Sequence, residues 1–199
     1  YGLTEASPVV SCNLPDLVNV STVGPPFRTN KIKIAKDGEI LVKGENVMLG
    51  YWNNKEETNR VIKDEWLHTG DIGEIDQNKN LKITDRKKDI IINLGGDNIA
   101  PSKIENILCL NEFIKQSFVY GDKKTYLVAL LVVEKNMNKG KVKIILENIN
   151  KNLSLIEKIK KFVLIYDEFT INNGMLTPTL KLKRKEIIKN YKQQLENLY

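Results

Sequence analysis

The pattern of apolar residues changes once along this chain, near the charged run DRKKD at Asp85 to Asp89. Before it, short alternating segments predict strands, and IKIAKDGEILVKG (Ile32 to Gly44) alternates around Asp37-Gly38, a strong hairpin signal. After it, helical and extended patterns alternate. A charged run alone is usually a solvated turn, so the boundary depends on the change in pattern. The sequence predicts a β-rich part followed by a compact α/β part.

Several further elements are predicted from periodicity. The segment GEIDQNKNLKITD predicts a strand, a turn at Asp76 to Asn80 and a second strand. The second part predicts, in order, the amphipathic helix PSKIENILCLN, the strands IKQSFVYGD and YLVALLVVEK, the helix VKIILENINKNL, another helix around Leu155 to Lys161, a strand at Phe162 to Phe169, and the final helix KRKEIIKNYKQQLENLY.

Composition excludes some classes of function. The 199 residues are 41% hydrophobic, and the net charge of +6 comes from 31 basic and 25 acidic residues that are interspersed, which favours a solvated lysine-rich surface over nucleic-acid binding. Cys12 and Cys109 lie far apart, which is typical of a reducing cytosol, and His68 is the single histidine, so zinc clusters and histidine triads lack parts. The longest apolar run, Tyr126 to Val133, suits a buried strand and is too short for a membrane span.

Three segments carry residues suited to chemistry, and each also has an ordinary structural interpretation. In WLHTGDIG, Gly70 and Gly73 flank Asp71, whose carboxylate either accepts a pair of hydroxyls, as a ribose offers, or caps its own turn. In INLGGDNIAP, Gly95-Gly96 permits a positive φ and close approach of a narrow ligand, or is a plain turn. In GMLTPTLKLKR, Lys181 either delivers a charge to a phosphoryl group or is a solvated helix start.

Together with YGLTE at the start of the chain, these segments resemble the motifs of the adenylate-forming superfamily, which includes acyl-CoA synthetases, luciferases and peptide-synthetase adenylation domains. YGLTE resembles a Tyr-Gly-x-Thr-Glu motif, GEILVKGENVMLGYWN a Gly-Glu to Gly-Tyr block, and WLHTGDIG a Trp-x-x-Thr-Gly-Asp motif. DRKKDIIINLGGDNIAPSKIE resembles the hinge block and PTLKLKR the terminal lysine motif. The resemblance spans essentially the whole chain and keeps the order of the motifs.

The details look most like bacterial long-chain fatty acyl-CoA synthetases, because Leu180 stands where other branches usually have Gly. The resemblance implies an ATP-dependent, Mg²⁺-dependent acid-thiol ligase that joins a fatty acid to AMP and then to coenzyme A. The implied fold is an α/β (α+β) chain, with a small β-barrel subdomain at 1–84, a hinge at 85–88 and a compact mobile C-terminal α+β domain at 89–199.

The same resemblance implies a role for each matching residue on the nucleotide side. Tyr1 would lie against adenine, Thr4 would touch the α-phosphate, and Glu5 would help to hold Mg²⁺. Asp71 would accept the ribose hydroxyls, and Arg86 would reach the same nucleotide.

In the mobile domain, Lys181 is the implied catalytic residue, selected over Lys183 by its Lys-x-x-Arg spacing to the arginine at 184. Lys88 matches the hinge position, and Gly95 and Gly96 would face the pantetheine arm of coenzyme A.

If the resemblance holds, YGLTE is an internal motif and the phosphate loop and acyl pocket precede it, so the isolated fragment is expected to be inactive. The implied partners are fatty acid, ATP and coenzyme A, without nucleic acid. The expected location is cytoplasmic, and a lipid substrate is compatible with peripheral membrane association. Alternatives are a module that binds coenzyme A or an acyl-carrier protein, and a fatty acyl-AMP ligase that acts on a carrier protein. The sequence leaves acyl chain length and oligomeric state open.

Overall fold

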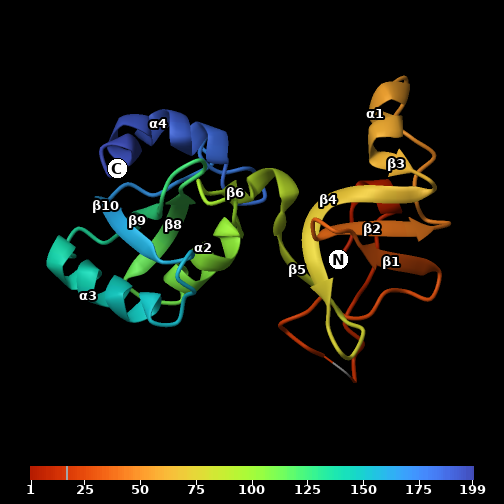
Figure 1. The fold of residues 1–199 in the computed structure, drawn as a ribbon, viewed down its shortest axis with the longest axis horizontal. Helices are drawn as coiled ribbons and strands as arrows, with labels where there is room; N and C mark the ends of the chain where they lie inside the picture. Colours follow the sequence, from red (N-terminus) through yellow and green to blue (C-terminus); the bar gives the residue numbers. More distant parts are fainter. Residues whose placement is uncertain (17) are drawn as a thin grey trace. The chain divides into compact units, whose positions relative to one another are not determined.

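The computed structural model describes residues 1–16 and 18–199 and has a mixed α/β fold. The chain divides into two compact units, Tyr1–Lys88 and Asp89–Tyr199 (Figure 1). The division falls within the charged run at which the sequence pattern changes.

The first unit is built on an antiparallel sheet in the order β1-β2-β4-β3, with β5 also paired to β4. Strand β4 is the centre: β2 lies along one edge, and β3 and β5 share the other. The elements of this unit are the 3₁₀ turn η1 (Thr4–Ala6), β1 (Asn30–Ile34), β2 (Glu39–Gly44), α1 (Lys55–Val61), β3 (Ile62–Lys63), β4 (Trp66–Ile75) and β5 (Leu81–Arg86), with the 3₁₀ turn η2 (Lys87–Asp89) reaching the division.

Irregular register curls this sheet. Leu41 of β2 pairs with His68, but Glu39 pairs with Ile72, so β4 holds two more residues than β2 between these pairs. Such bulges bend a strand and increase its twist. The sequence predicted a small β-barrel, but the described strands form a curled half-barrel. At β5, irregular backbone continues the edge of the sheet in place of another strand: Leu81 exchanges hydrogen bonds with Val23 (2.8 Å) and Gly24 (2.9 Å).

Two predicted hairpins are confirmed, and one helix was missed. The turn between β1 and β2 has Gly38 at φ 84°, and β4 and β5 are joined by a turn at 76–80, in which the Asp76 carboxylate accepts the amides of Asn78 (2.9 Å) and Asn80 (2.8 Å). Helix α1 begins after Asn54, whose side chain accepts the Glu57 amide at 3.0 Å, an N-cap that was readable in the sequence as Asn-x-x-Glu.

The second unit is a three-layer arrangement around the sheet β10-β9-β8, in which β9 is antiparallel to β8 and parallel to β10. The hairpin β6-β7 precedes it, and α3 forms the crossover between the parallel strands. Its elements are β6 (Ile91–Ile92), β7 (Asn98–Ile99), α2 (Pro101–Cys109), β8 (Ile114–Tyr120), β9 (Leu127–Val133), α3 (Lys139–Asn150), β10 (Ile159–Ile165) and α4 (Arg184–Glu196).

All seven residues of β9 are buried, because helices cover both faces of the sheet (Figure 1). Leu127, Ala129, Leu131 and Val133 pack with α2 and α3 on one face. The alternate residues, Val128, Leu130 and Val132, pack with α4 on the other. A strand buried on both faces reads as a continuous apolar run, which is why the run at Tyr126 to Val133 appeared in the sequence.

The prediction of a helix around Leu155 to Lys161 is wrong. Turns follow α3, and β10 already begins at Ile159 and ends at Ile165, so the strand predicted at 162–169 is shifted. The Asn150 side chain explains the shift, since it bonds both the carbonyl (2.9 Å) and the amide (3.0 Å) of Ile159 and starts the strand there. In the described part of the chain, no helix is both long and apolar enough to cross a membrane.

Candidate functional site

The Thr-Gly-Asp segment of β4 forms the bulge that faces Ile40 of β2. Gly70 adopts φ 70°, a conformation that favours glycine. The Thr69 hydroxyl donates to the Ile40 carbonyl at 2.7 Å and accepts the Asp71 amide at 3.1 Å, and the Gly70 amide donates to the Glu39 carboxylate at 3.0 Å. Two side chains therefore satisfy backbone groups of the bulge that lie outside regular strand pairing.

The bulge places Asp71 where it is 3% exposed, with both carboxylate oxygens engaged. The Tyr1 hydroxyl donates to one oxygen, and Arg86 Nε lies 2.7 Å from the other. Burial and the hydrogen bond to Asp71 raise the pKa of the Tyr1 phenol. Because the partners of the carboxylate are Tyr1 and Arg86, the alternative that Asp71 caps its own turn does not hold. A carboxylate held this way can accept hydroxyl groups of a ligand in place of Tyr1.

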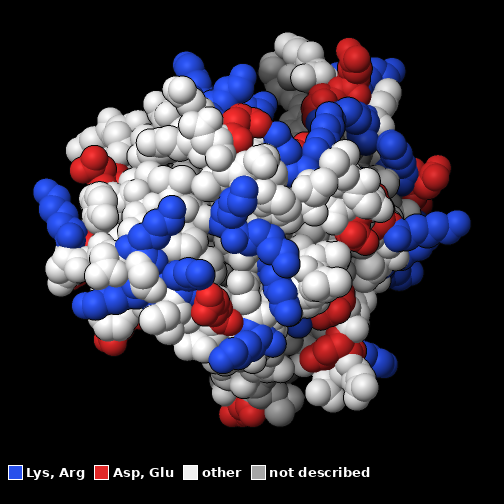
Figure 2. All heavy atoms as spheres, turned by 60° about the vertical axis from the view of Figure 1, so that its left-hand side comes forward, with Lys and Arg blue, Asp and Glu red and all other residues white. Residues whose placement is uncertain are grey.

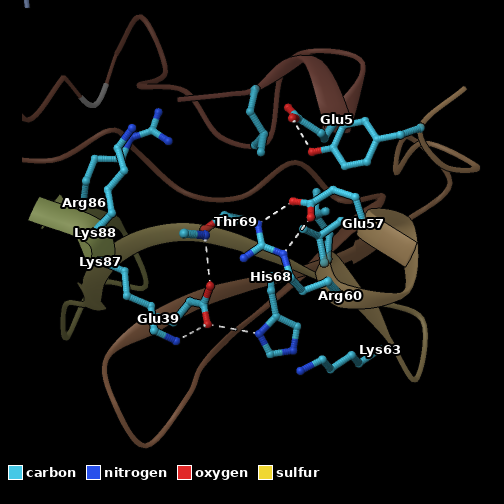
Figure 3. Close-up of a pocket in the computed structure, with 15 residues that line it drawn as sticks. Glu5, Glu39, Glu57, Arg60, Lys63, His68, Thr69, Arg86, Lys87 and Lys88 are labelled. Atoms are coloured by element: carbon cyan, nitrogen blue, oxygen red, sulfur yellow. Dashed lines mark hydrogen bonds and ion pairs between the residues drawn. The ribbon is translucent and has the colours of Figure 1, made fainter. Parts of the chain in front are cut away.

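Beside the bulge lies a cavity of about 670 Å³ that is lined mainly by charged side chains (Figure 3). Arg86 and Gly70 connect it with the Asp71 site. The charged residues and the histidine that line it are Glu5, Glu39, Glu57, Arg60, Lys63, His68, Arg86, Lys87 and Lys88. Several cations around one cavity favour an anionic ligand, such as a phosphate chain.

Glu5 reaches this cavity from the turn η1. Its backbone carbonyl accepts the Met48 amide at 2.8 Å, and its Oε1 accepts the Tyr51 hydroxyl at 2.9 Å (Figure 3). Burial and this hydrogen bond raise the pKa of Tyr51. A single carboxylate is compatible with Mg²⁺, which proteins commonly hold through one or two carboxylates together with substrate phosphates, whereas the described residues contain no group of three or more His, Cys, Asp or Glu side chains that could hold a metal ion by itself. Thr4, at the start of the same turn, is exposed and is not part of the cavity lining.

Glu39 lies on the wall of the cavity with 5% exposure. Its second oxygen lies 3.0 Å from His68 Nδ1 and 2.9 Å from Lys87 Nζ (Figure 3). Burial disfavours its charge, but the hydrogen bonds from His68, Lys87 and the Gly70 amide outweigh this, so its pKa lies below the ordinary range. Lys87 also pairs with Asp37 at 2.7 Å, and the two carboxylates raise the pKa of Lys87.

The predicted hinge begins inside a strand. Asp85 and Arg86 belong to β5, and the chain leaves it at Lys87 in the turn η2. Lys88 lines the cavity and is the last residue of the first unit.

In the second unit, Gly95 and Gly96 form the exposed tip between β6 and β7. Gly96 has φ 83°, and open space surrounds the position of a side chain there. Asn93 and Asp97 close the tip by two hydrogen bonds of 2.9 Å. The positive φ that the sequence permitted is therefore present at Gly96, and a plain turn has the same geometry.

Lys181 is exposed on another loop of the second unit, just before α4. Its amide donates to the Thr177 hydroxyl at 3.0 Å, and its carbonyl accepts the Thr177 amide at 2.8 Å, which fixes the backbone and leaves the ammonium group extended into solvent. Leu180 has φ 61°, a conformation that favours glycine. Lys183 is also exposed, and its amide bonds the Met175 carbonyl at 2.8 Å.

The sequence matches two family models. The AMP-binding enzyme C-terminal domain matches residues 88–199, and the AMP-binding enzyme model matches residues 1–52. This chain belongs to the AMP-binding enzyme family. Long-chain-fatty-acid--CoA ligase FadD15 from Mycobacterium bovis is 34% identical over 223 aligned positions that cover 100% of this chain and 37% of the ligase. The chain thus spans little more than a third of such relatives.

Solved AMP-binding enzymes share the fold. Two structures of O-succinylbenzoate Coenzyme A Synthetase from Bacillus subtilis, with AMP and with ATP and magnesium ion, have TM-scores of 0.78 and 0.77 at 29% identity, covering 94% of this chain and 40% of theirs. The A-PCP didomain of carboxylic acid reductase from Segniliparus rugosus, in complex with AMP, has a TM-score of 0.81 at 26% identity and covers 100% of this chain and 30% of that one.

The structure brings together Tyr1, Asp71 and Arg86, and it places Glu5 on the same cavity as Arg86. Sequence reasoning missed the other side chains of the site, above all Glu39, His68 and Lys87, because their partners come from separate strands. One signal was available in the sequence: Glu39 directly follows the hairpin glycine, Gly38. At the start of a predicted strand, nothing local explains why this residue carries a charge.

Proposed function

We propose that this chain is part of an ATP-dependent long-chain fatty acid CoA ligase and holds its nucleotide-side residues and its mobile domain. The observation that carries the proposal is the buried Asp71 carboxylate, which lies on a bulge between Tyr1 and Arg86, beside a cavity lined by more cations than carboxylates. The FadD15 relative supplies the reaction class, and the ligands of the solved relatives supply the nucleotide and the metal ion.

In this proposal the carboxylate substrate attacks the α-phosphate of ATP, pyrophosphate leaves, and the thiol of coenzyme A then displaces AMP. Asp71 accepts the ribose hydroxyls, Arg86 reaches the same nucleotide, and Tyr1 lies near the base. Thr4 contacts the α-phosphate, and Glu5 holds Mg²⁺, which neutralises charge on the phosphates.

The residues of the second unit serve the two steps in turn. Lys181 stabilises the charge that develops during adenylation, because a lysine on an exposed loop is a positionable point charge. Lys88 is the hinge position, and the Gly95-Gly96 tip faces the pantetheine arm, for which a site without Cβ atoms leaves room.

The test is a pyrophosphate-release assay with ATP, Mg²⁺ and a panel of fatty acids, run on the 199-residue chain and on the longest natural protein that contains it. We expect turnover in the longer protein and no measurable turnover in the 199-residue chain, because positioning supplies much of catalysis and this chain spans only 37% of the FadD15 relative. Turnover of the isolated chain would overturn the expected inactivity, and a longer protein that releases no pyrophosphate with any fatty acid would overturn the proposed reaction.

A second candidate acceptor is an acyl-carrier protein. The Segniliparus rugosus relative carries a PCP domain in the same chain, and the second unit holds 18 basic against 12 acidic residues, which suits an acidic carrier. In that case the protein is a fatty acyl-AMP ligase, or this part binds carrier or coenzyme A without catalysing a reaction. Competition between coenzyme A and a carrier protein for the acyl-adenylate distinguishes the acceptors, and a Gly96→Ala variant with unchanged affinity for both would argue against the tip as their site.

A further inference from the structure

The Glu39 side chain contacts two parts of the first unit that are far apart in sequence. One carboxylate oxygen accepts the Gly70 amide of the bulge at 3.0 Å, and the other lies 2.9 Å from Lys87 Nζ at the end of the unit (Figure 3). We propose that Glu39 is a positioning residue that ties the Asp71 bulge to the segment just before the hinge. The effect of Glu39 on nucleotide binding and on the hinge rests on the proposed function.

The contact with the bulge follows from the strand register. Between the pairs Leu41–His68 and Glu39–Ile72, β4 has three residues where β2 has one. The Gly70 amide therefore lies outside regular pairing with β2. Even a partly buried amide without an acceptor costs free energy, and Glu39 supplies that acceptor. No atom lies within 4 Å of the position that a Cβ would take at Gly70, so the hydrogen bond to Glu39, rather than packing on that side, holds this residue in place.

The contact with Lys87 fixes the other end. Lys87 pairs with Glu39 and with Asp37, at 2.9 and 2.7 Å, and both carboxylates belong to the β1-β2 hairpin. The chain is therefore anchored through Lys87, and any dihedral change of a hinge must occur from Lys88 onward. Because one buried carboxylate serves both contacts, loss of its charge leaves Lys87 paired only with the half-exposed Asp37, and loss of its oxygens also releases Gly70.

Four single variants separate these contacts. Glu39→Ala removes both contacts of Glu39, Lys87→Ala removes the two ion pairs of Lys87 and keeps the Gly70 contact, and Glu39→Gln keeps an oxygen for Gly70 but removes the charge. Glu74→Ala is the matched control, since Glu74 lies on β4, the strand that carries the bulge, and pairs with Lys82 on the exposed surface.

The first measurement is amide hydrogen exchange on the 199-residue chain, followed in peptides that cover 67–72 and 85–90. We expect faster exchange by about tenfold or more in both peptides for Glu39→Ala, and only in 85–90 for Lys87→Ala. Glu39→Gln should also speed exchange only in 85–90, and by less than Lys87→Ala, because Asp37 still pairs with Lys87. Glu74→Ala should leave both peptides unchanged. If Glu39→Ala unfolds the unit, Glu39→Gln and Lys87→Ala still decide the hinge-side contact.

Unchanged exchange of 67–72 in a folded Glu39→Ala variant would overturn the inference, as would equal loosening of that peptide by Lys87→Ala. AMP titration then tests the link with function: we expect about tenfold weaker binding for Glu39→Ala and less than about threefold for Lys87→Ala. A wild-type chain that binds no AMP would contradict the proposed function, whereas the exchange pattern would still decide the role of Glu39.

Discussion

At the scale of single residues, the site depends on one buried carboxylate. Asp71 has a cation on one side and a phenol on the other, so its charge is compensated by Arg86 while Tyr1 marks a position for a hydroxyl donor. Sequence spacing pointed to Asp71, but its partners became visible only when β4 and β5 were paired.

We expect Asp71→Asn to weaken AMP binding by about tenfold or more, because an amide is a weaker acceptor than a carboxylate and leaves Arg86 without its partner. Isothermal titration measures this affinity. Asp64→Asn is the control, since Asp64 is an exposed loop residue at φ 50° that asparagine also adopts readily. Equal affinities of the wild type and Asp71→Asn would remove Asp71 from the nucleotide site.

Leu180 has a backbone conformation that glycine adopts more easily, with φ 61° and a side chain that is 69% exposed. Leu180→Gly should change the free energy of unfolding by less than about 1 kcal/mol, since relief of left-handed strain offsets the larger entropy of the unfolded chain. Leu180→Pro should destabilise the loop, because proline fixes φ near −65° and removes the amide that donates to Thr177 at 2.9 Å. Chemical denaturation measures both, and a proline variant as stable as the glycine variant would contradict this view of the loop.

At the scale of elements, a buried ion pair joins helices on opposite faces of the second sheet. Glu105 of α2 lies 2.6 Å from Arg184, the first residue of α4, and also accepts the Val119 amide of β8 at 2.8 Å. Arg184 in turn stacks over Phe118. This arginine is the one that follows the Lys181 loop, so the pair fixes the end of that loop.

We expect Arg184→Met to lower the free energy of unfolding by about 3–5 kcal/mol, because the buried Glu105 carboxylate would lose the cation that lies 2.6 Å from it. Glu105→Gln should lower the free energy of unfolding by less, since the side-chain oxygen of glutamine can still accept the Val119 amide. A double-mutant cycle by denaturation measures the coupling, with the exposed Lys143–Glu147 pair as control. Additive losses at 105 and 184 would show that the two side chains act independently.

The β2, β4 and η2 elements meet at Glu39, which makes the first unit sensitive to acid. The pKa of Glu39 lies below its ordinary value, so its charge stabilises the fold above the unfolded pKa of about 4.3 and this contribution is lost as the pH falls through the lower folded pKa. The groups that face it are His68, Lys87 and, through Lys87, Asp37, whose pKa is lowered chiefly by Lys87.

Thermal unfolding between pH 3 and 6 should therefore show a loss of stability on acidification that is smaller in Glu39→Gln than in the wild type. Glu74→Gln, on the exposed surface of β4, should follow the wild type. A Glu39→Gln profile parallel to that of the wild type would contradict the assigned cause.

At the scale of the whole molecule, the two units differ in charge. The first holds 13 basic and 13 acidic residues and the second 18 and 12, so the net charge of +6 belongs to the second. Figure 2 shows Lys and Arg side chains interspersed with acidic ones over the face of the protein that is in view. This separation could not be inferred from the total charge.

Because each unit has its own core, we expect residues 89–199 expressed alone to unfold cooperatively with nearly the midpoint that this part has in the whole chain. Circular dichroism on the isolated segment and on the whole chain compares the two. A segment 89–199 without a cooperative transition would show that its fold depends on the first unit and would contradict the proposed domain boundary.

The sequence by itself determined the local features of this protein: the hairpin at Gly38, the turn at 76–80, the helix that begins at Pro101, and the motifs that identify the family. These depend on residues close together in the chain, so periodicity and turn chemistry report them directly. The false helix at 155–161 shows the limit, since Asn150 bonds Ile159 and tertiary pairing starts the strand there. The half-barrel, the bulge and the contacts of Asp71, Glu39 and Arg184 were decided only by the tertiary structure, because strand register and buried charge pairing join residues whose separation in sequence carries no local signal.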